Sequence, residues 1–377
     1  MLDLVDARWK GPKVVVFIVY NPAGQEWEDL TDTAKSELAG IKKRSASWSN
    51  ILVVSFVASL MSKKEDAWDY WSKAMPKRYQ ENPTDSKTER SHALMTIYPI
   101  NTLRNVAVDL ASTNWVFPTD IDFAPSAMLY ARLRSAYLPR FAAVPRIAVV
   151  VPHFDTLGKG QLDLEVPADF RALNASLYRG EWRPFAAPPS LLGQDLNYPS
   201  RDDWPEGVSG TDYKTWFARS KAGVVGMFPL VVEGTLARRG PLKGQAVHPD
   251  RWVPTNRNEW WEPYVIVRRH EPAAGHQTLP RYPEQFVGRY FNKLAFVAAL
   301  RAQRYKFFAL DQEFLVHQPH PEAMSYKEKN SITLRKGMAA VHAQFLQELV
   351  KQHDRAAKPE TSKYDEGWQL PNCIGVF

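Results

Sequence analysis

The sequence predicts an α/β protein built on a mostly parallel sheet that is flanked by helices. Residues 14–20, 51–57 and 146–151 are near-continuous apolar runs, which are typical of central strands covered on both faces. Between these runs lie polar segments and stretches with apolar residues at helical spacing. This alternation across residues 13–152 is the pattern of a layered α/β fold.

The first predicted strand ends at Tyr20 and Asn21, just before a proline. Ligands of such sheets bind outside the carboxyl ends of the strands, so we expect Tyr20 and Asn21 to lie on a ligand-binding rim. After the second strand, the polar segment 61–91 predicts a helix and a loop. Residues 99–109 then carry apolar side chains at helical spacing, which predicts a helix leading into the next strand.

An acidic pair is the most informative feature of the chain. Residues 115–123 are an apolar run opened by a tryptophan and interrupted near its end by Asp120 and Asp122. The run predicts a buried strand whose tip emerges from the core. Two carboxylates at such a tip can hold a divalent cation that bridges them to a diphosphate. The alternative is a strand-end turn with solvated carboxylates, and the strand before the pair favours the functional interpretation.

The second half of the chain has a different composition. Residues 153–262 are rich in Pro, Gly and Trp, which predicts loops and short strands that cover the cleft. Residues 264–267 predict a strand, residues 291–300 a helix, and residues 307–310 and 314–316 two short strands. A long amphipathic helix follows, with one face formed by Leu334, Met338, Val341, Phe345 and Leu349.

Composition limits the classes of protein that the chain can belong to. It has 377 residues, of which 45% are hydrophobic and 24% charged, as in a soluble globular protein. Its net charge of +7 suits an anionic ligand, but the basic residues are dispersed and form no stripe for nucleic acid. Cys373 is the only cysteine, so no disulfide forms within the chain. We expect no signal peptide and no membrane-spanning run in this sequence.

Two histidines follow a predicted strand end. A neutral imidazole at His317 can complete the coordination of Mn²⁺, which accepts nitrogen beside oxygen. The alternative is a hydrogen-bonded histidine at the sheet edge, while His320 lies beyond a proline and suits a structural role. His270 and His276 do not form a zinc-protease helix, because they are six residues apart with a proline between them. A P-loop and a nucleophile elbow are both missing from the sequence.

Several ordered blocks resemble glycosyltransferase family 49, which includes the glucuronyltransferase half of LARGE and a β-1,4-glucuronyltransferase. The two longest blocks are YPINTLRNVA at residues 98–107 and VFPTDIDF at residues 116–123. The resemblance resumes at residues 261–264, 284–288, 291–293, 305–308 and 314–317. It spans most of residues 13–352 in the family's order, which is far more specific than one pair of aspartates.

The resemblance implies a GT-A fold, inversion at the anomeric carbon, Mn²⁺ as cofactor and a UDP-sugar donor, UDP-glucuronate first. It implies a single catalytic domain over residues 1–357, with a nucleotide-sugar half (13–152), a loop-rich acceptor half (153–357) and an extended tail (358–377). It also implies the Golgi or ER lumen as the location, with a cytoplasmic relative as the alternative because no signal peptide or anchor is visible in the sequence. The implied residues are Asp120, Asp122 and His317 for the metal, Arg104 and Asn105 together with the two aspartates for the donor, and Glu284 for catalysis or acceptor contact.

The acceptor side is left open by the sequence. Pro283 and Gln285 replace the acidic and basic neighbours that the family has beside Glu284, so a glycan or nucleotide binder with little or no turnover is the alternative function. Glu262 and Asp212 are further candidates for the general base, and geometry must decide among the three carboxylates. Trp216, Trp260 and Trp261 can stack on acceptor sugars, although packing in the core is the default expectation for each.

Overall fold

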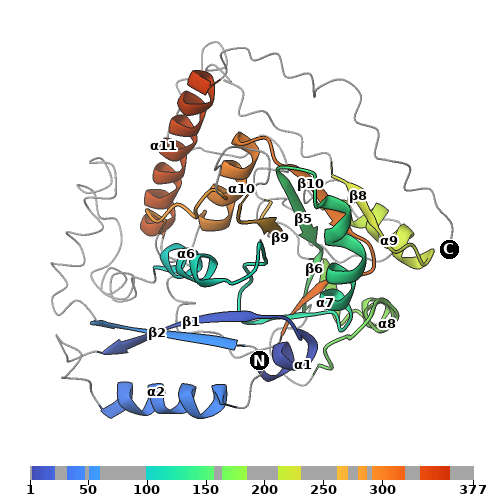
Figure 1. The fold of residues 1–377 in the computed structure, drawn as a ribbon, viewed down its shortest axis with the longest axis horizontal. Coiled ribbons are helices and arrows are strands. Elements are labelled where there is room, and N and C mark those ends of the chain that lie inside the picture. The colour runs from blue at the N-terminus through green and yellow to red at the C-terminus, as the bar shows by residue number, and fades with distance from the viewer. Residues whose placement is uncertain are drawn as a thin grey trace.

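The computed structural model confirms the α/β class, with helices on both sides of its sheets (Figure 1). It describes residues 2–21, 32–46, 51–59, 99–156, 164–184, 211–230, 261–270, 279–286, 291–318 and 332–356. The helix expected in residues 61–91, Cys373 and the tail from residue 358 lie outside the described residues. Among the described helices, none has both the length and the apolarity that crossing a bilayer requires.

The first two strands form a parallel pair. β1 (Lys13–Asn21) runs beside β2 (Ile51–Ser59), in register from Lys13 opposite Ile51 to Asn21 opposite Ser59. Two helices contact β1, namely α2 (Asp32–Ser45) and α6 (Ile100–Leu110), and they lie on opposite sides of it in Figure 1. β1 and β2 are thus parallel strands with α2 between them in the chain, in agreement with the predicted alternation of strands and helices.

A five-stranded mixed sheet forms the centre of the molecule. Its order is β3 (Trp115–Val116), β9 (Tyr264–Arg268), β5 (Ile147–Val151), β10 (Lys306–Leu310) and β8 (Met227–Pro229). β5 and β10 are parallel, and the other neighbours are antiparallel. Every residue of β5 and β9 is buried, which explains the apolar run of β5 and of residues 264–267 in β9; Arg268 at the end of β9 is also buried.

A four-stranded sheet holds the site. Its order is β4 (Phe123–Pro125), β11 (Leu315–His317), β6 (His153–Thr156) and β7 (Trp182–Pro184). β11 is antiparallel to β4, with His317 opposite Phe123, and parallel to β6. β6 follows β5 in the chain after Pro152, whose missing N–H cannot continue the ladder.

Three details differ from the sequence-based expectation. Residues 153–262, expected to form loops and short strands, also contain the helices α8 (Phe170–Tyr178) and α9 (Tyr213–Lys221). The described strands divide among three sheets instead of one, because β9 inserts antiparallel between β3 and β5 and Pro152 separates β5 from β6. The run 115–123 is also not one continuous strand: β3 ends at Val116, β4 begins at Phe123, and both aspartates lie in the connection. Pro118 in this connection cannot donate a ladder hydrogen bond.

Most of the remaining helices enclose two apolar clusters, one on each face of β5. Ala148 and Val150 belong to the first cluster, and Val149 and Val151 belong to the second. The enclosing elements are α7 (Leu129–Arg132) with the π-helix Leu133–Tyr137 and the 3₁₀-helix Leu138–Phe141, α8 (Phe170–Tyr178), α9 (Tyr213–Lys221) and α10 (Asn292–Ala302). Of the other helices, α1 (Leu2–Arg8) contacts β4, and α11 (Ile332–Ala356) contacts α10. Met338 and Val341 on α11 are buried, as its amphipathic pattern predicts.

Candidate functional site

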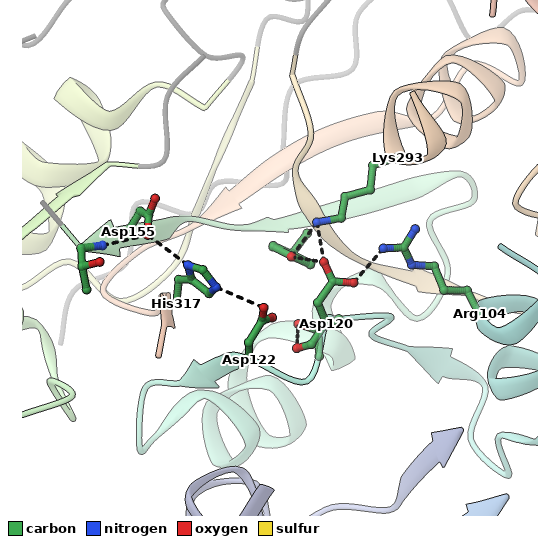
Figure 2. Close-up of polar contacts among 9 residues, drawn as sticks. Arg104, Asp120, Asp122, Asp155, Lys293 and His317 are labelled. Atoms are coloured by element: carbon green, nitrogen blue, oxygen red, sulfur yellow. Dashed lines mark hydrogen bonds and ion pairs between the residues drawn. The ribbon is translucent and has the colours of Figure 1, made fainter. Parts of the chain in front are cut away.

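The connection between β3 and β4 directs its two aspartates to different partners. Asp120 contacts a cluster of cations, whereas Asp122 contacts His317 at the end of β11 (Figure 2). The two carboxylates are only two positions apart, so the turn between them separates two chemical environments. The site therefore has a cationic half and an imidazole half.

Asp120 forms the centre of the cationic half. Its Oδ1 accepts a hydrogen bond from Arg104 Nη2 at 2.7 Å, and its Oδ2 accepts from the Tyr264 hydroxyl at 2.7 Å. Lys293 Nζ lies 2.8 Å from the same Oδ2. Burial favours the protonated acid, but Lys293 and Arg104 outweigh it and hold the pKa of Asp120 well below its usual range. Two cations on one carboxylate leave one excess positive charge.

Lys293 and Tyr264 were not among the residues predicted from the sequence. Lys293, in the first turn of α10, also donates to the Tyr264 hydroxyl at 2.6 Å and lies 4.0 Å from the centre of its ring. Burial and the charge of Asp120 raise the pKa of Tyr264 well above its usual value, which keeps it a hydrogen-bond donor. A lysine in the first turn of a helix is an ordinary surface pattern, so only the resemblance block at residues 291–293 pointed to it.

The imidazole half is a chain of three side chains. His317 Nε2 lies 3.1 Å from Asp122 Oδ2, and His317 Nδ1 lies 3.0 Å from Asp155 Oδ1. The ring of Phe123 stacks on the imidazole at 4.9 Å between centroids and 19° between planes. Burial lowers the pKa of His317, but hydrogen bonds to Asp122 and Asp155 outweigh it and raise the pKa to about 9. Asp155 is the other residue here that sequence reasoning missed.

The convergence of Asp122 and His317 fits a divalent cation. Two adjacent ligands of an octahedral ion, each at roughly 2.1 Å, lie about 3 Å apart, close to the observed separation. One carboxylate oxygen and one imidazole nitrogen are donors that Mn²⁺ accepts. Within the described ranges no group of three or more His, Cys, Asp and Glu side chains is arranged to hold a metal. Among the described residues, Asp122 and His317 would thus provide two ligands, and water, a bound substrate or a rearranged Asp120 could provide further ones.

Asp120 is the predicted metal ligand that the geometry supports least. Both of its oxygens already accept hydrogen bonds from Arg104, Tyr264 and Lys293. To bind a metal directly, Asp120 would have to share or release these contacts. Its role as a direct ligand stays a prediction, whereas Asp122 and His317 are adjacent as predicted.

Asn105 and Glu284 form a second polar group at the side of α6. Asn105 is 3% exposed and donates to Tyr282 O at 2.9 Å and to Glu284 Oε1 at 2.8 Å. Glu284 also accepts from Thr102 at 3.2 Å and lies 3.5 Å from Arg281. The hydrogen bond from Asn105 is the largest influence that lowers the pKa of Glu284. Asn105 thus connects α6 to the segment before α10, and the donor role predicted for it stays a prediction.

The other nominated side chains have different surroundings. Burial raises the pKa of Glu262, and Lys293, Arg104 and Asp120 influence it electrostatically, so this carboxyl lies near the cationic half. Asp212 accepts a hydrogen bond from Thr215 N at 2.9 Å and caps α9. Trp216 and Trp261 are buried in the first apolar cluster, as the default expectation has it. Trp260, His320, His276 and the side chains of Tyr20 and Asn21 lie outside the described residues.

An α/β fold with an acidic loop beside a strand-end histidine is the arrangement of a GT-A type glycosyltransferase. The chain belongs to the family described as glycosyl-transferase for dystroglycan, whose model matches residues 1–221 and 246–354. The match covers the connection between β3 and β4 with its two aspartates, and it also covers α10 and β11. The blocks that resembled family 49 therefore lie in a family match that extends over most of the chain.

Curated relatives point to the same family. The chain is 30% identical over 263 residues to the mouse protein named xylosyl- and glucuronyltransferase LARGE2, and 30% identical over 263 residues to its human counterpart. It is 27% identical over 261 residues to human xylosyl- and glucuronyltransferase LARGE1. Each match covers 69% of this chain but only 27–30% of the relative. The similarity thus concerns one part of longer proteins.

Proposed function

We propose that this chain transfers a sugar, with glucuronate favoured, from a UDP-sugar to a glycan acceptor with inversion of configuration and dependence on Mn²⁺. The observation that carries the proposal is the 3.1 Å approach of His317 Nε2 to Asp122 Oδ2 across the β4–β11 pairing. The names of the relatives, xylosyl- and glucuronyltransferases, support this class of donor. By resemblance to them, the site of action is the Golgi or ER lumen.

The cationic half is suited to bind the anionic donor. Arg104 and Lys293 share one carboxylate, that of Asp120, so the excess positive charge is available to an anion. A diphosphate supplies such an anion, and the carboxylate of a uronate sugar supplies a second one. The names of the relatives include glucuronyltransferase, so UDP-glucuronate is the first donor to test.

Asp122 and His317 are the side chains that would hold Mn²⁺ in this proposal. When bound, Mn²⁺ supplies electrostatic stabilisation of the negative charge that develops on the departing UDP. Phe123 and Asp155 hold the imidazole in place, so that the ligand atoms are positioned before the donor binds. Asp120 keeps Arg104 and Lys293 close to the same loop.

Glu262 is a candidate for the general base beside Glu284, because its carboxyl lies near the cationic half of the site. Burial raises the pKa of Glu262, whereas the hydrogen bond from Asn105 lowers the pKa of Glu284. In the proposed step one of these two carboxylates removes the proton of an acceptor hydroxyl while that oxygen bonds to the anomeric carbon. The bond from this carbon to the diphosphate breaks, and UDP leaves with the electron pair. General-base assistance contributes about 10²–10⁴-fold to such a step.

Release of UDP from a panel of UDP-sugars tests the proposal. We expect turnover that requires Mn²⁺, is fastest with UDP-glucuronate and falls at least about 100-fold in Asp122→Asn. The matched control is Asp109→Asn, an exposed aspartate paired with Arg281, which should retain full turnover. Full Mn²⁺-stimulated turnover in a folded Asp122→Asn protein would refute the proposal. A comparison of Glu262→Gln with Glu284→Gln then identifies the base, because only the base should lose kcat with little change in KM.

A binding protein without turnover is the second candidate. It is motivated by Glu284, whose carboxylate is occupied by Asn105, Thr102 and Arg281 and which lacks the family's charged neighbours. This candidate predicts calorimetric binding of UDP with Mn²⁺ but no UDP release with any donor and acceptor pair. Turnover with a single UDP-sugar would exclude it.

A further inference from the structure

The imidazole of His317 is held by contacts with three residues. Asp122 faces its Nε2 and Asp155 faces its Nδ1 (Figure 2). The ring of Phe123 stacks against the imidazole. Asp122 and Phe123 come from the acidic connection and β4, but Asp155 comes from β6 on the other side of β11. The Asp155 contact therefore needs an explanation separate from the acidic pair.

The register of β6 and β11 places Asp155 beside His317. Leu315 is opposite His153 and Val316 is opposite Phe154, so the next pair along these parallel strands is His317 and Asp155. Paired residues of neighbouring strands direct their side chains to the same face, which brings the carboxylate to the imidazole. The Oδ1 atom of Asp155 also accepts a hydrogen bond from the backbone N–H of Thr156 at 2.9 Å, which fixes the orientation of the carboxylate.

The contact with Asp155 determines which nitrogen keeps its proton when a metal binds. An ionised carboxylate has only acceptors, so without metal the contacts with Asp155 and Asp122 are met by protons on Nδ1 and Nε2. Once Nε2 loses its proton to bind a cation, the hydrogen bond to Asp155 keeps the remaining proton on Nδ1, and the lone pair of Nε2 faces the cation beside Asp122. Arg183 is a weaker partner of Asp155, since its Nη2 lies 3.9 Å from Oδ2. The contact with His317 is therefore the closer of the two.

We propose that Asp155 is a positioning residue that holds His317 as the Nδ1–H tautomer, so that Nε2 presents its lone pair to a divalent cation shared with Asp122. The inference deepens the proposed function and rests on it for the presence of the cation. Carboxylates that orient a metal-binding histidine in this way typically change metal affinity about 10- to 100-fold when removed. Asp155 itself touches neither the donor nor the acceptor in this proposal.

Binding of Mn²⁺ without nucleotide, followed through the electron paramagnetic resonance signal of the free ion, provides the first test. Asp155→Ala should weaken Mn²⁺ binding about 10- to 100-fold. Asp155→Asn should weaken Mn²⁺ binding less than about tenfold. The Thr156 N–H needs an acceptor at the position of Oδ1, so the amide oxygen of the asparagine should occupy this position and still accept from His317 Nδ1. The matched control is Asp169→Ala, which also removes a carboxylate that accepts a backbone N–H, at the start of α8, and should leave Mn²⁺ affinity unchanged.

The tautomer provides a second test that does not depend on the stability of any variant. In the protein loaded with diamagnetic Cd²⁺, the ¹⁵N resonances of His317 should show a proton on Nδ1 and the metal on Nε2. The reverse assignment would overturn the inference, and so would an Asp155→Ala protein that is folded and binds Mn²⁺ as the wild type does. Failure of the proposed function is a different result: the wild type would bind Mn²⁺ with the expected tautomer but transfer no sugar.

Discussion

Nε2 of His317 lies 3.1 Å from Oδ2 of Asp122, although 195 positions separate the two residues in the chain. The contact exists because β4 and β11 pair antiparallel with His317 opposite Phe123, the residue after Asp122. By contrast, Asp120 and Arg104 are only 16 positions apart. The imidazole half of the site thus forms only when β4 and β11 have paired. In the cationic half, the contact between Arg104 and Asp120 joins residues that are close in the chain.

Replacing Lys293 tests the cationic half. Lys293→Met should raise the KM for UDP-glucuronate at least about tenfold, because a hydrogen bond from a charged donor typically contributes about 1.5–3 kcal/mol. Steady-state kinetics with UDP-glucuronate and UDP-xylose measure the effect, and the loss should be larger for the uronate. Lys351→Met is the matched control, since this exposed lysine on α11 pairs with Glu348 away from Asp120. Equal KM values in both variants would contradict the prediction.

Metal binding should depend on pH through His317. Because hydrogen bonds to Asp122 and Asp155 raise its pKa to about 9, the imidazole is protonated at neutral pH without metal and must lose its proton to bind one. Mn²⁺ affinity should therefore rise about tenfold per pH unit between pH 7 and pH 8.5, with about one proton released per ion. Calorimetry in two buffers of different ionisation enthalpy counts that proton. A flat affinity over this range would be incompatible with the raised pKa.

The buried ion pair of Asp311 and Arg219 should matter for stability. Asp311 is fully buried, and both of its oxygens accept from Arg219, at 2.7 and 2.8 Å. Arg219→Met leaves the carboxylate without its cation and should lower the free energy of unfolding by about 3 kcal/mol. Urea denaturation measures this loss, and the double variant Arg219→Met, Asp311→Leu should recover part of it. A double variant that is less stable than Arg219→Met would contradict the prediction.

His342 should make the fold sensitive to acid. It is 3% exposed on α11, stacked against Phe291, and burial lowers its pKa to about 4. The imidazole has a higher pKa in the unfolded chain, which therefore binds the proton more readily. The stability that the neutral imidazole contributes to the folded protein is complete above about pH 6.5 and is lost as the pH falls towards 4. The free energy of unfolding should fall about 2 kcal/mol more in the wild type than in His342→Leu between pH 7.5 and pH 5. If the free energies of unfolding of the two proteins changed equally with pH, the prediction would be wrong.

The order of the elements could be predicted from the sequence. Residues 14–20, 51–57 and 146–151 appear as β1, β2 and β5, and the helical spacing of residues 99–109 appears as α6. These predictions hold because burial on both faces of a strand, or on one face of a helix, requires a local pattern of apolar residues. The sheet to which each strand belongs could not be predicted in this way. The pairing of β9 with β3 and β5 depends on segments more than 100 positions apart.

By itself the sequence determined that this is an α/β protein with an acidic pair after an apolar run and a histidine at a later strand end. Only the tertiary structure decided that Asp120 pairs with Arg104 and Lys293 and that Asp122 contacts His317. It also decided that Asp155 contacts the other nitrogen of the same imidazole. The physical reason is that apolar periodicity is a local property of the chain. The partner of a polar side chain, however, is set by strand register and by contacts between distant segments, which no local pattern encodes.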